Sequence, residues 1–223
     1  MGGRLPQSDD RIAILGKTGS GKTVAGLWHL SKQDIDARVW AIIDFKGDVN
    51  INNIDKAQSI DYDTNLSKLK PGLYILRVMP DEEEELDAWF VKVWETENIG
   101  VMVDEGFMVG QRSRGFNMCL IQGRSKHITM IVLSQRPVWM SRYVLSEASF
   151  IQAFSLNDRD DTRSVKRFVE DRGNLSVLNR VPRYHSYYYD VSEDDLRVLS
   201  PVPPVDDILA DIDTKLPIVR KTL

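Results

Sequence analysis

The stretch "GKTGSGKT", from Gly16 to Thr23, decides the fold. It matches the pattern G-x-x-x-x-G-K-[ST], in which glycines let the backbone curl so that successive N–H groups point at phosphate oxygens. The apolar run "RIAIL" at 11–15 predicts a buried strand before it, and "KTVAGLWHLSKQ" at 22–33 predicts a helix after it. A strand, a glycine-rich turn and a helix N-terminus in this order predict a phosphate-binding loop.

The loop also predicts which groups of a nucleotide it would bind. We expect Lys22 to reach the β- and γ-phosphates and Thr23 to hold Mg²⁺ through its hydroxyl. The nucleotide is expected to be ATP, because no segment resembles the N-K-x-D pattern that reads guanine. The expected nucleotide-binding residues are Gly16, Lys17, Thr18, Gly19, Ser20, Gly21, Lys22 and Thr23.

Apolar segments alternate with helical ones along the rest of the chain. Strands are expected at 38–45, 59–60, 73–79, 99–105, 128–135 and 149–156, and helices at 81–97, 117–125, 141–147 and 158–173. The strands are apolar throughout, which is typical of a parallel sheet with helices on both faces. The alternating segment "RYHSYYYDV" at 183–191 predicts an edge strand.

This pattern predicts a simple organisation. We expect an N-terminal arm over residues 1–10, one α/β domain over 11–200, and a C-terminal tail over 201–223. The tail is proline-rich at its start, and we interpret it as an arm or linker with one short helix.

Two adjacent carboxylates end the strand "VMVDE". Asp104 would contact Mg²⁺ through water, and Glu105 would orient and deprotonate the water that attacks the nucleotide. The alternative is a strand end that merely caps a helix. Asp44, in "IIDFKGD", is a rival carboxylate, and Gln135 ends the next strand where an amide would face the γ-phosphate.

The charges are unevenly distributed. The chain has 29 Lys and Arg against 33 Asp and Glu, and the net charge of −4 argues against a surface coated in basic residues for nucleic acid. However, the segment 106–146 contains no acidic residue, which predicts a strip that meets phosphate, of a nucleotide or of a polynucleotide, unless these are solvated faces. Its basic residues are Arg112, Arg114, Arg124, Lys126, Arg136 and Arg142.

Two further observations concern the compartment. The single cysteine, Cys119, excludes an internal disulfide framework and is typical of a reducing environment. No apolar run approaches the roughly 20 residues of a membrane span, so we expect a soluble protein without a span of its own.

Taken together, "GKTGSGKT", "IIDFKGD", "VMVDEGF" and "QGRSKHITMIVLSQRP" resemble the HerA/FtsK superfamily of P-loop ATPases over about residues 11–173. The resemblance implies a RecA-like P-loop NTPase core. Within the superfamily, a short chain without membrane segments or large extra domains is similar to the genome-packaging ATPases of tailless, internal-membrane phages and related viruses.

The resemblance carries several expectations. It implies a homo-oligomeric ring, expected to be a hexamer, that drives double-stranded DNA into a preformed capsid and meets capsid-vertex or membrane proteins of a virion. The protein would lie in the host cytoplasm and associate with the virion. It also implies catalytic roles for Lys22, Glu105 and Gln135 and metal-binding roles for Thr23 and Asp104.

The resemblance also places each ATP site between subunits, with an arginine from the neighbour. Arg124 sits where the family has this arginine, and Arg112, Arg114 and Arg136 are alternatives. Arg112 and Arg114 are in addition candidates for a DNA-contacting pore loop, unless they lie in a solvated surface loop.

Two other functions stay open at the level of the sequence. One is a phage morphogenesis or extrusion ATPase, or a cellular DNA-transfer ATPase, which keeps the motor and changes its task. The other is a nucleotide-switched assembly module that gates a partner without translocation, with the proline-rich tail as the docking segment.

Overall fold

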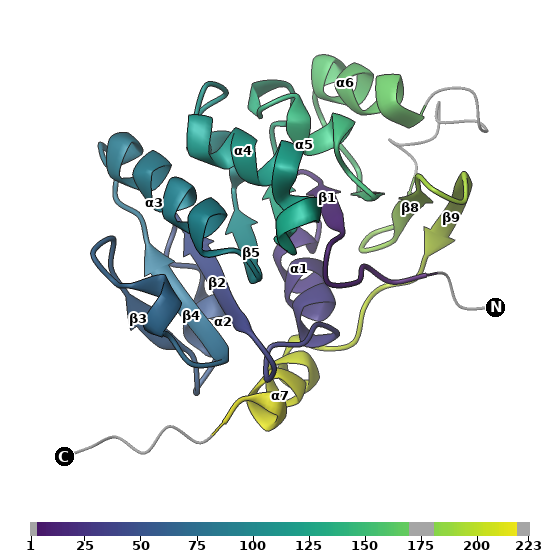
Figure 1. Cartoon of the computed structure of the whole chain (residues 1–223). Helices are drawn as coiled ribbons and strands as arrows, with labels where there is room; N and C mark the ends of the chain where they lie inside the picture. The colour runs from purple at the N-terminus through teal and green to yellow at the C-terminus, as the bar shows by residue number, and fades with distance from the viewer. Residues whose placement is uncertain (1–3, 170–180, 218–223) are drawn as a thin grey trace.

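The predicted strands form the middle layer of the molecule (Figure 1). The computed structural model describes residues 4–169 and 181–217, and within these ranges nine strands build one sheet in the order β3-β4-β2-β5-β6-β1-β7-β8-β9. Every neighbouring pair from β3 to β7 is parallel, whereas β8 and β9 are antiparallel additions. The strands are β1 (Arg11–Leu15), β2 (Val39–Asp44), β3 (Gln58–Ile60), β4 (Gly72–Arg77), β5 (Ile99–Asp104), β6 (Thr129–Ser134), β7 (Phe150–Ala153), β8 (Ser186–Asp190) and β9 (Asp195–Leu199).

Helices cover both faces of this sheet, as the sequence predicts (Figure 1). Ile12 and Ile14 of β1 pack toward α1, α2 and α7, while Ala13 and Leu15 pack toward α3, α4, α5 and α6. The helices are α1 (Lys22–Ser31), α2 (Val49–Asn52), α3 (Glu83–Thr96), α4 (Arg114–Gln122), α5 (Tyr143–Ser146), α6 (Arg159–Val169) and α7 (Val205–Lys215). Four short 3₁₀ turns lie between them in the described residues: η1 (Leu66–Lys68), η2 (Gly106–Val109), η3 (Gly123–Lys126) and η4 (Pro137–Trp139).

A close contact between neighbouring strands shows how tightly this layer is packed. The Trp40 ring of β2 is fully buried and lies directly over Gly100 of β5. A Cβ atom added at Gly100 would lie 2.2 Å from the indole ring, closer than any real contact. The glycine is therefore required there, because a side chain would push the indole out of the core.

The strand register gathers the predicted site residues at one edge. Asp44 of β2 pairs with Asp104 of β5, and Leu15 of β1 pairs with Ser134 of β6. Because these strands are parallel, the segments that follow them emerge side by side at the carboxyl edge of the sheet. Ligands of open α/β sheets bind at this edge.

Helix α4 and the strands β8 and β9 differ from the sequence prediction, and the short helix α2 is an addition to it. Helix α4 begins at Arg114 rather than near residue 117, because the Ser113 side chain accepts a hydrogen bond from the backbone N–H of Phe116 and caps the helix there. The predicted edge strand at 183–191 forms β8, but β9 pairs outside it and becomes the edge. The Asp190 side chain, which accepts from the N–H groups of Ser192 and Glu193, shapes the turn that allows this reversal.

The C-terminal segment holds the short helix that its sequence predicts. This helix, α7, lies against α1 and buries Ile208, Leu209 and Ile212. The Lys56 ammonium fixes its end by donating to the backbone carbonyls of Asp213 and Leu216. The segment is thus folded onto the domain as far as residue 217.

Helix α6 follows the predicted 158–173 helix as far as Val169, and the predicted stop at Gly173 lies outside the described residues. None of the helices in ranges 4–169 and 181–217 combines the length and apolar character that a bilayer crossing requires.

Candidate active site

The loop from Gly16 to Gly21 is held at the carboxyl edge of the sheet by its neighbours. The Gly16 N–H donates to the Ser134 carbonyl at 3.1 Å, and the Lys17 N–H donates to the Ser155 carbonyl at 3.0 Å. Gly21 has a φ of 96°, in the left-handed region that favours glycine, and α1 begins immediately after it. The N-terminal dipole of α1 therefore adds positive potential at the loop, as a phosphate site requires.

The structure brings the predicted acid pair to this loop. Asp104 and Glu105 are almost completely buried, with relative exposures of 1% and 0%. The Lys22 Nζ lies 3.2 Å from Oε1 of Glu105, and the Thr23 hydroxyl lies 3.4 Å from Oδ1 of Asp104. These residues come from α1 and from the end of β5, so separate elements supply the two halves of the site.

Glu105 has an unusual backbone conformation. Its φ of 63° and ψ of 57° are left-handed, which costs a non-glycine residue about 1 kcal/mol or more. This conformation turns the chain out of β5 into η2 while the carboxylate contacts both Lys22 and Lys46. Backbone strain of this kind is often found at functional sites.

Two carboxylate oxygens of the site, Oδ2 of Asp104 and Oε2 of Glu105, are buried without a hydrogen-bond partner among the described residues. Burial raises the pKa of Asp104 to about 6 and lowers the pKa of Lys22 and of Lys46. These charges are therefore only partly compensated within the described part of the chain. A bound cation would lower the pKa of Asp104 again.

The donor set fits Mg²⁺. This ion prefers oxygen ligands and usually keeps several waters, so one or two protein oxygens shared with nucleotide phosphates are sufficient. The Thr23 hydroxyl and the unpartnered Oδ2 of Asp104 are such oxygens. Residues 4–169 and 181–217 contain no cluster of three or more His, Cys, Asp or Glu side chains that could hold a metal by themselves.

The rival carboxylate, Asp44, has a different task. Its Oδ1 accepts hydrogen bonds from the backbone N–H groups of Lys46, Gly47 and Asp48, and its Oδ2 forms an ion pair with Arg77 at 2.8 Å. Asp44 thus shapes the loop after β2 and lies beside the pocket.

That loop supplies a site residue that sequence reasoning missed, Lys46. Its ammonium reaches Oε1 of Glu105. A signal exists in the sequence, since Lys46 follows a buried strand that ends at the same edge as the acid pair.

Gln135 lies where the sequence predicts it, above the loop. Its amide oxygen accepts a hydrogen bond from the Thr18 hydroxyl. The next residue, Arg136, turns away from the loop: its Nε lies 3.1 Å from Oδ2 of Asp161 on α6, and its guanidinium covers the Trp139 ring. Arg136 is therefore engaged within its own chain.

The other arginine candidates do not enter the pocket. Arg124 is exposed in η3, at the amino end of β6, whereas the loop lies at the carboxyl end. The six residues of β6 separate the two edges by about 20 Å at 3.3 Å per residue. Arg112 is exposed in the loop after η2, and Arg114 is the first residue of α4.

A cleft continues from the phosphate loop along its far side. It consists of two adjoining pockets that share Phe154 and Tyr184 as lining residues. The first is also lined by Lys17, Gly19 and Ser20, and the second is apolar and is walled by the segment 201–205, "PVPPV". Sequence reasoning missed this cleft, because the segments that build it are far apart in the chain and carry no local motif.

Comparison with known proteins relates the whole chain to viral motors. It is 42% identical over 217 residues to the DNA packaging ATPase P9 of Enterobacteria phage PRD1, a match that covers 94% of this chain and 95% of that protein. No protein-family model matches the chain.

Solved structures share the fold. The genome packaging NTPase B204 of Sulfolobus turreted icosahedral virus 2, in complex with ATP-gammaS, matches with a TM-score of 0.69 at 15% identity and covers 89% of this chain and 100% of that chain. VirB4 of Thermoanaerobacter pseudethanolicus matches with a TM-score of 0.65 at 10% identity, covering 87% of this chain and 89% of that one. At such low identities these two likenesses concern the fold alone.

Proposed function

Because this chain belongs to the family of viral DNA-packaging ATPases, within the HerA/FtsK-like P-loop ATPases, we propose that it hydrolyses ATP to drive double-stranded DNA into a preformed capsid. The observation that carries the proposal is the meeting of Lys22 and Thr23 with Asp104 and Glu105 at one edge of the sheet. A glycine-rich loop, its lysine and two carboxylates at the end of another parallel strand of the same sheet are the parts that a nucleoside triphosphatase needs.

The residues divide the chemical work. The backbone N–H groups of the loop that follow Lys17 and the ammonium of Lys22 bind the phosphates. Glu105 orients a water molecule toward the γ-phosphorus and accepts its proton while the new O–P bond forms and the bond to the β-phosphate oxygen breaks. Gln135 contacts the γ-phosphate from the opposite side. The products are ADP and inorganic phosphate.

Thr23 and Asp104 would hold Mg²⁺, which neutralises charge on the β- and γ-phosphate oxygens when it is bound. The base would lie in the cleft beyond the loop, against the Tyr184 ring and the apolar segment 201–205. The position of Tyr184 supports this placement, because its ring lies directly beside Gly21 of the phosphate loop. A Cβ atom added at Gly21 would lie 3.2 Å from the ring.

We further propose that the working form is a homo-oligomeric ring, with six subunits as the expected number. Arg124 cannot serve the pocket of its own chain, because it lies at the opposite edge of the sheet. A neighbouring subunit could receive it at its own nucleotide, where a guanidinium stabilises the charge on the transferring phosphoryl group. The proposed partners are double-stranded DNA and the capsid-vertex or membrane proteins of the virion, with the protein in the host cytoplasm and on the virion.

The test is the rate of ATP hydrolysis with and without duplex DNA. We expect DNA to stimulate turnover, and Glu105→Gln to lower the rate by roughly 10²–10⁴-fold while ATP still binds. Glu95→Gln, at an exposed glutamate on α3, is the matched control and should behave like the wild type. Equal turnover with and without DNA, in a protein that stays monomeric, would favour an assembly module instead.

A further inference from the structure

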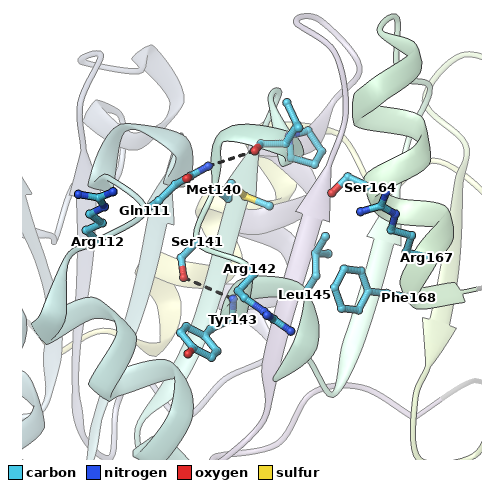
Figure 2. Close-up of a pocket in the computed structure, with 12 residues that line it drawn as sticks. Gln111, Arg112, Met140, Ser141, Arg142, Tyr143, Leu145, Ser164, Arg167 and Phe168 are labelled. Atoms are coloured by element: carbon cyan, nitrogen blue, oxygen red, sulfur yellow. Dashed lines mark hydrogen bonds between the residues drawn. The ribbon is translucent and has the colours of Figure 1, made fainter.

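A basic groove lies on the described surface outside the nucleotide pocket. It has a volume of about 620 Å³ and lies between η4, α5, α6 and the loop before α4. Three arginines line it: Arg112 from the loop, Arg142 before α5 and Arg167 from α6. In Figure 2, Arg142 stands between the other two, beside the rings of Tyr143 and Phe168.

No described residue of the lining compensates the charge of this groove. None of the lining residues that the structure describes is acidic. No carboxylate in ranges 4–169 and 181–217 forms an ion pair with Arg112, Arg142 or Arg167, although other surface arginines such as Arg77 and Arg163 have such partners. All three are exposed, so their guanidinium groups are accessible to a ligand.

Hydrogen bonds hold the segments that line the groove to one another. Gln111 donates to the Val138 carbonyl at 3.1 Å and ties the loop to η4, as Figure 2 shows. Asp161 of α6 accepts from the Val138 N–H at 3.0 Å and ties the helix to the same turn. The segments that carry Arg112 and Arg167 are thus both tied to Val138. This fixed spacing lowers the cost in conformational entropy when both arginines bind one ligand.

We propose that this groove binds the phosphate backbone of double-stranded DNA. Guanidinium groups match phosphate oxygens in geometry, and aromatic rings beside them cover the rim without reading sequence. The inference rests on the proposed function, which supplies DNA as the substrate. It adds Arg142 and Arg167 to the DNA contacts, although Arg167 lies far from the basic segment 106–146 in sequence.

The position of the groove gives it a route to the nucleotide. One of the residues that line the groove is Pro137. It lies two residues after Gln135, whose side chain contacts Thr18 of the phosphate loop. Between them, Arg136 pairs with Asp161 of α6, the helix that carries Arg167. A movement of Gln135 on hydrolysis would therefore be passed to both sides of the groove.

The experiment measures binding of a short fluorescent DNA duplex across a salt titration. We expect the double variant Arg142→Gln/Arg167→Gln to bind at least about 10-fold more weakly at low salt. The slope of log affinity against log salt should fall by about 0.9 for each DNA phosphate that is no longer neutralised. The control Lys68→Gln/Lys70→Gln removes the same charge from an exposed site near β4 and should retain the wild-type slope.

Two further arms keep the result unambiguous. Arg142→Lys/Arg167→Lys preserves the charge and should keep most of the slope, whereas a fold defect would also weaken binding of a fluorescent ATP analogue. If the glutamine variant bound DNA as the wild type does, the proposal that this groove binds DNA would be overturned. The proposed packaging function would be unaffected. The groove would be a contact between copies if that variant formed smaller particles and kept its DNA affinity. Absence of DNA binding by the wild type would overturn both proposals.

Discussion

Glu105 is contacted by two lysines, and only one of them belongs to the phosphate loop. When Lys22 binds phosphates, Lys46 remains in contact with the Glu105 carboxylate and fixes its position. The backbone of Glu105 is left-handed at the same point. The two lysines thus divide the work between substrate binding and positioning of the base.

The first prediction concerns Lys46→Gln. Lys46 contacts Glu105 and is not part of the phosphate loop. We therefore expect kcat to fall about 10-fold while the KM for ATP stays nearly unchanged. This pattern indicates an interaction that is needed in the transition state. Steady-state kinetics measure both constants, with Lys68→Gln as the control. A higher KM at constant kcat would instead make Lys46 a nucleotide-binding residue.

The second prediction concerns Tyr184. Stacking of a base on an aromatic ring contributes about 1–3 kcal/mol, so Tyr184→Ala should weaken ATP binding by roughly 5- to 150-fold. Tyr184→Phe should bind like the wild type, and inorganic tripolyphosphate, which has no base, should not distinguish the variants. Calorimetric titration gives the affinities. An equal loss for both ligands would place Tyr184 in the phosphate site instead.

The sequence predicts the site residues to the extent that a local rule places them. The loop motif and the strand-end position of Asp104, Glu105 and Gln135 are such rules, and the structure brings these residues to one edge. Tyr184 could not be predicted, because its place beside Gly21 depends on how β8 and the preceding segment return to the sheet.

Among the elements, the connection from β6 to α6 joins the nucleotide to the proposed DNA groove. Asp161 is its centre, since it binds both the Arg136 side chain and the Val138 backbone. Asp161 is 1% exposed, so both contacts are shielded from solvent.

The third prediction is that Asp161→Asn uncouples the two sites. The variant keeps an oxygen for the Val138 N–H but removes the charge that holds Arg136. We expect the difference in DNA affinity between the ATP-analogue and ADP states to shrink several-fold, with hydrolysis in the absence of DNA unchanged. Asp160→Asn, on the exposed neighbour, should leave the difference intact. A full wild-type difference in Asp161→Asn would rule out this connection.

Elements are predictable where burial decides their conformation. The sequence places the strands from β1 to β7 within a few residues, because most of them are apolar runs. The start of α4 and the existence of β9 depend instead on single polar side chains, Ser113 and Asp190, that cap or turn the chain. Such side chains occur in many loops, so their effect is visible only in the structure.

At the scale of the whole molecule, the pocket and Arg124 lie on opposite edges. The fourth prediction follows: Arg124→Ala and Lys22→Ala should each be inactive alone but recover part of the activity when mixed. In a mixed ring, an intact Lys22 can face an intact Arg124 from the neighbouring subunit. ATPase assays at varied mixing ratios measure the recovery. Absence of recovery, with mixed rings verified by mass, would refute a role for Arg124 between subunits.

The stability of the fold depends on a buried histidine. His29 of α1 is completely buried, its Nε2 lies 2.8 Å from the Gln152 Oε1, and burial lowers its pKa to about 4. The unfolded chain therefore binds a proton, below about pH 6.5, that the folded chain excludes. Its contribution to stability is present above about pH 6.5 and is lost as the pH falls toward 4.

The fifth prediction is a difference between variants. Between about pH 7 and pH 4.5 the wild type should lose about 2 kcal/mol more of its free energy of unfolding than His29→Gln, which has no titrating ring. Urea denaturation at each pH measures this, with His127→Asn at an exposed histidine as the control. Parallel pH profiles for the wild type and His29→Gln would contradict the assignment.

The position of the segment 201–205 has a consequence for biosynthesis. The phosphate loop leaves the ribosome well before the apolar wall of the cleft and the helix α7 that anchors it against α1, which follow all nine described strands in the chain. A growing chain consequently lacks a complete cleft until this later segment has emerged, since domains fold during synthesis only as their parts emerge. Prematurely terminated products would carry the loop without that wall, and would compete poorly for the cell's nucleotide.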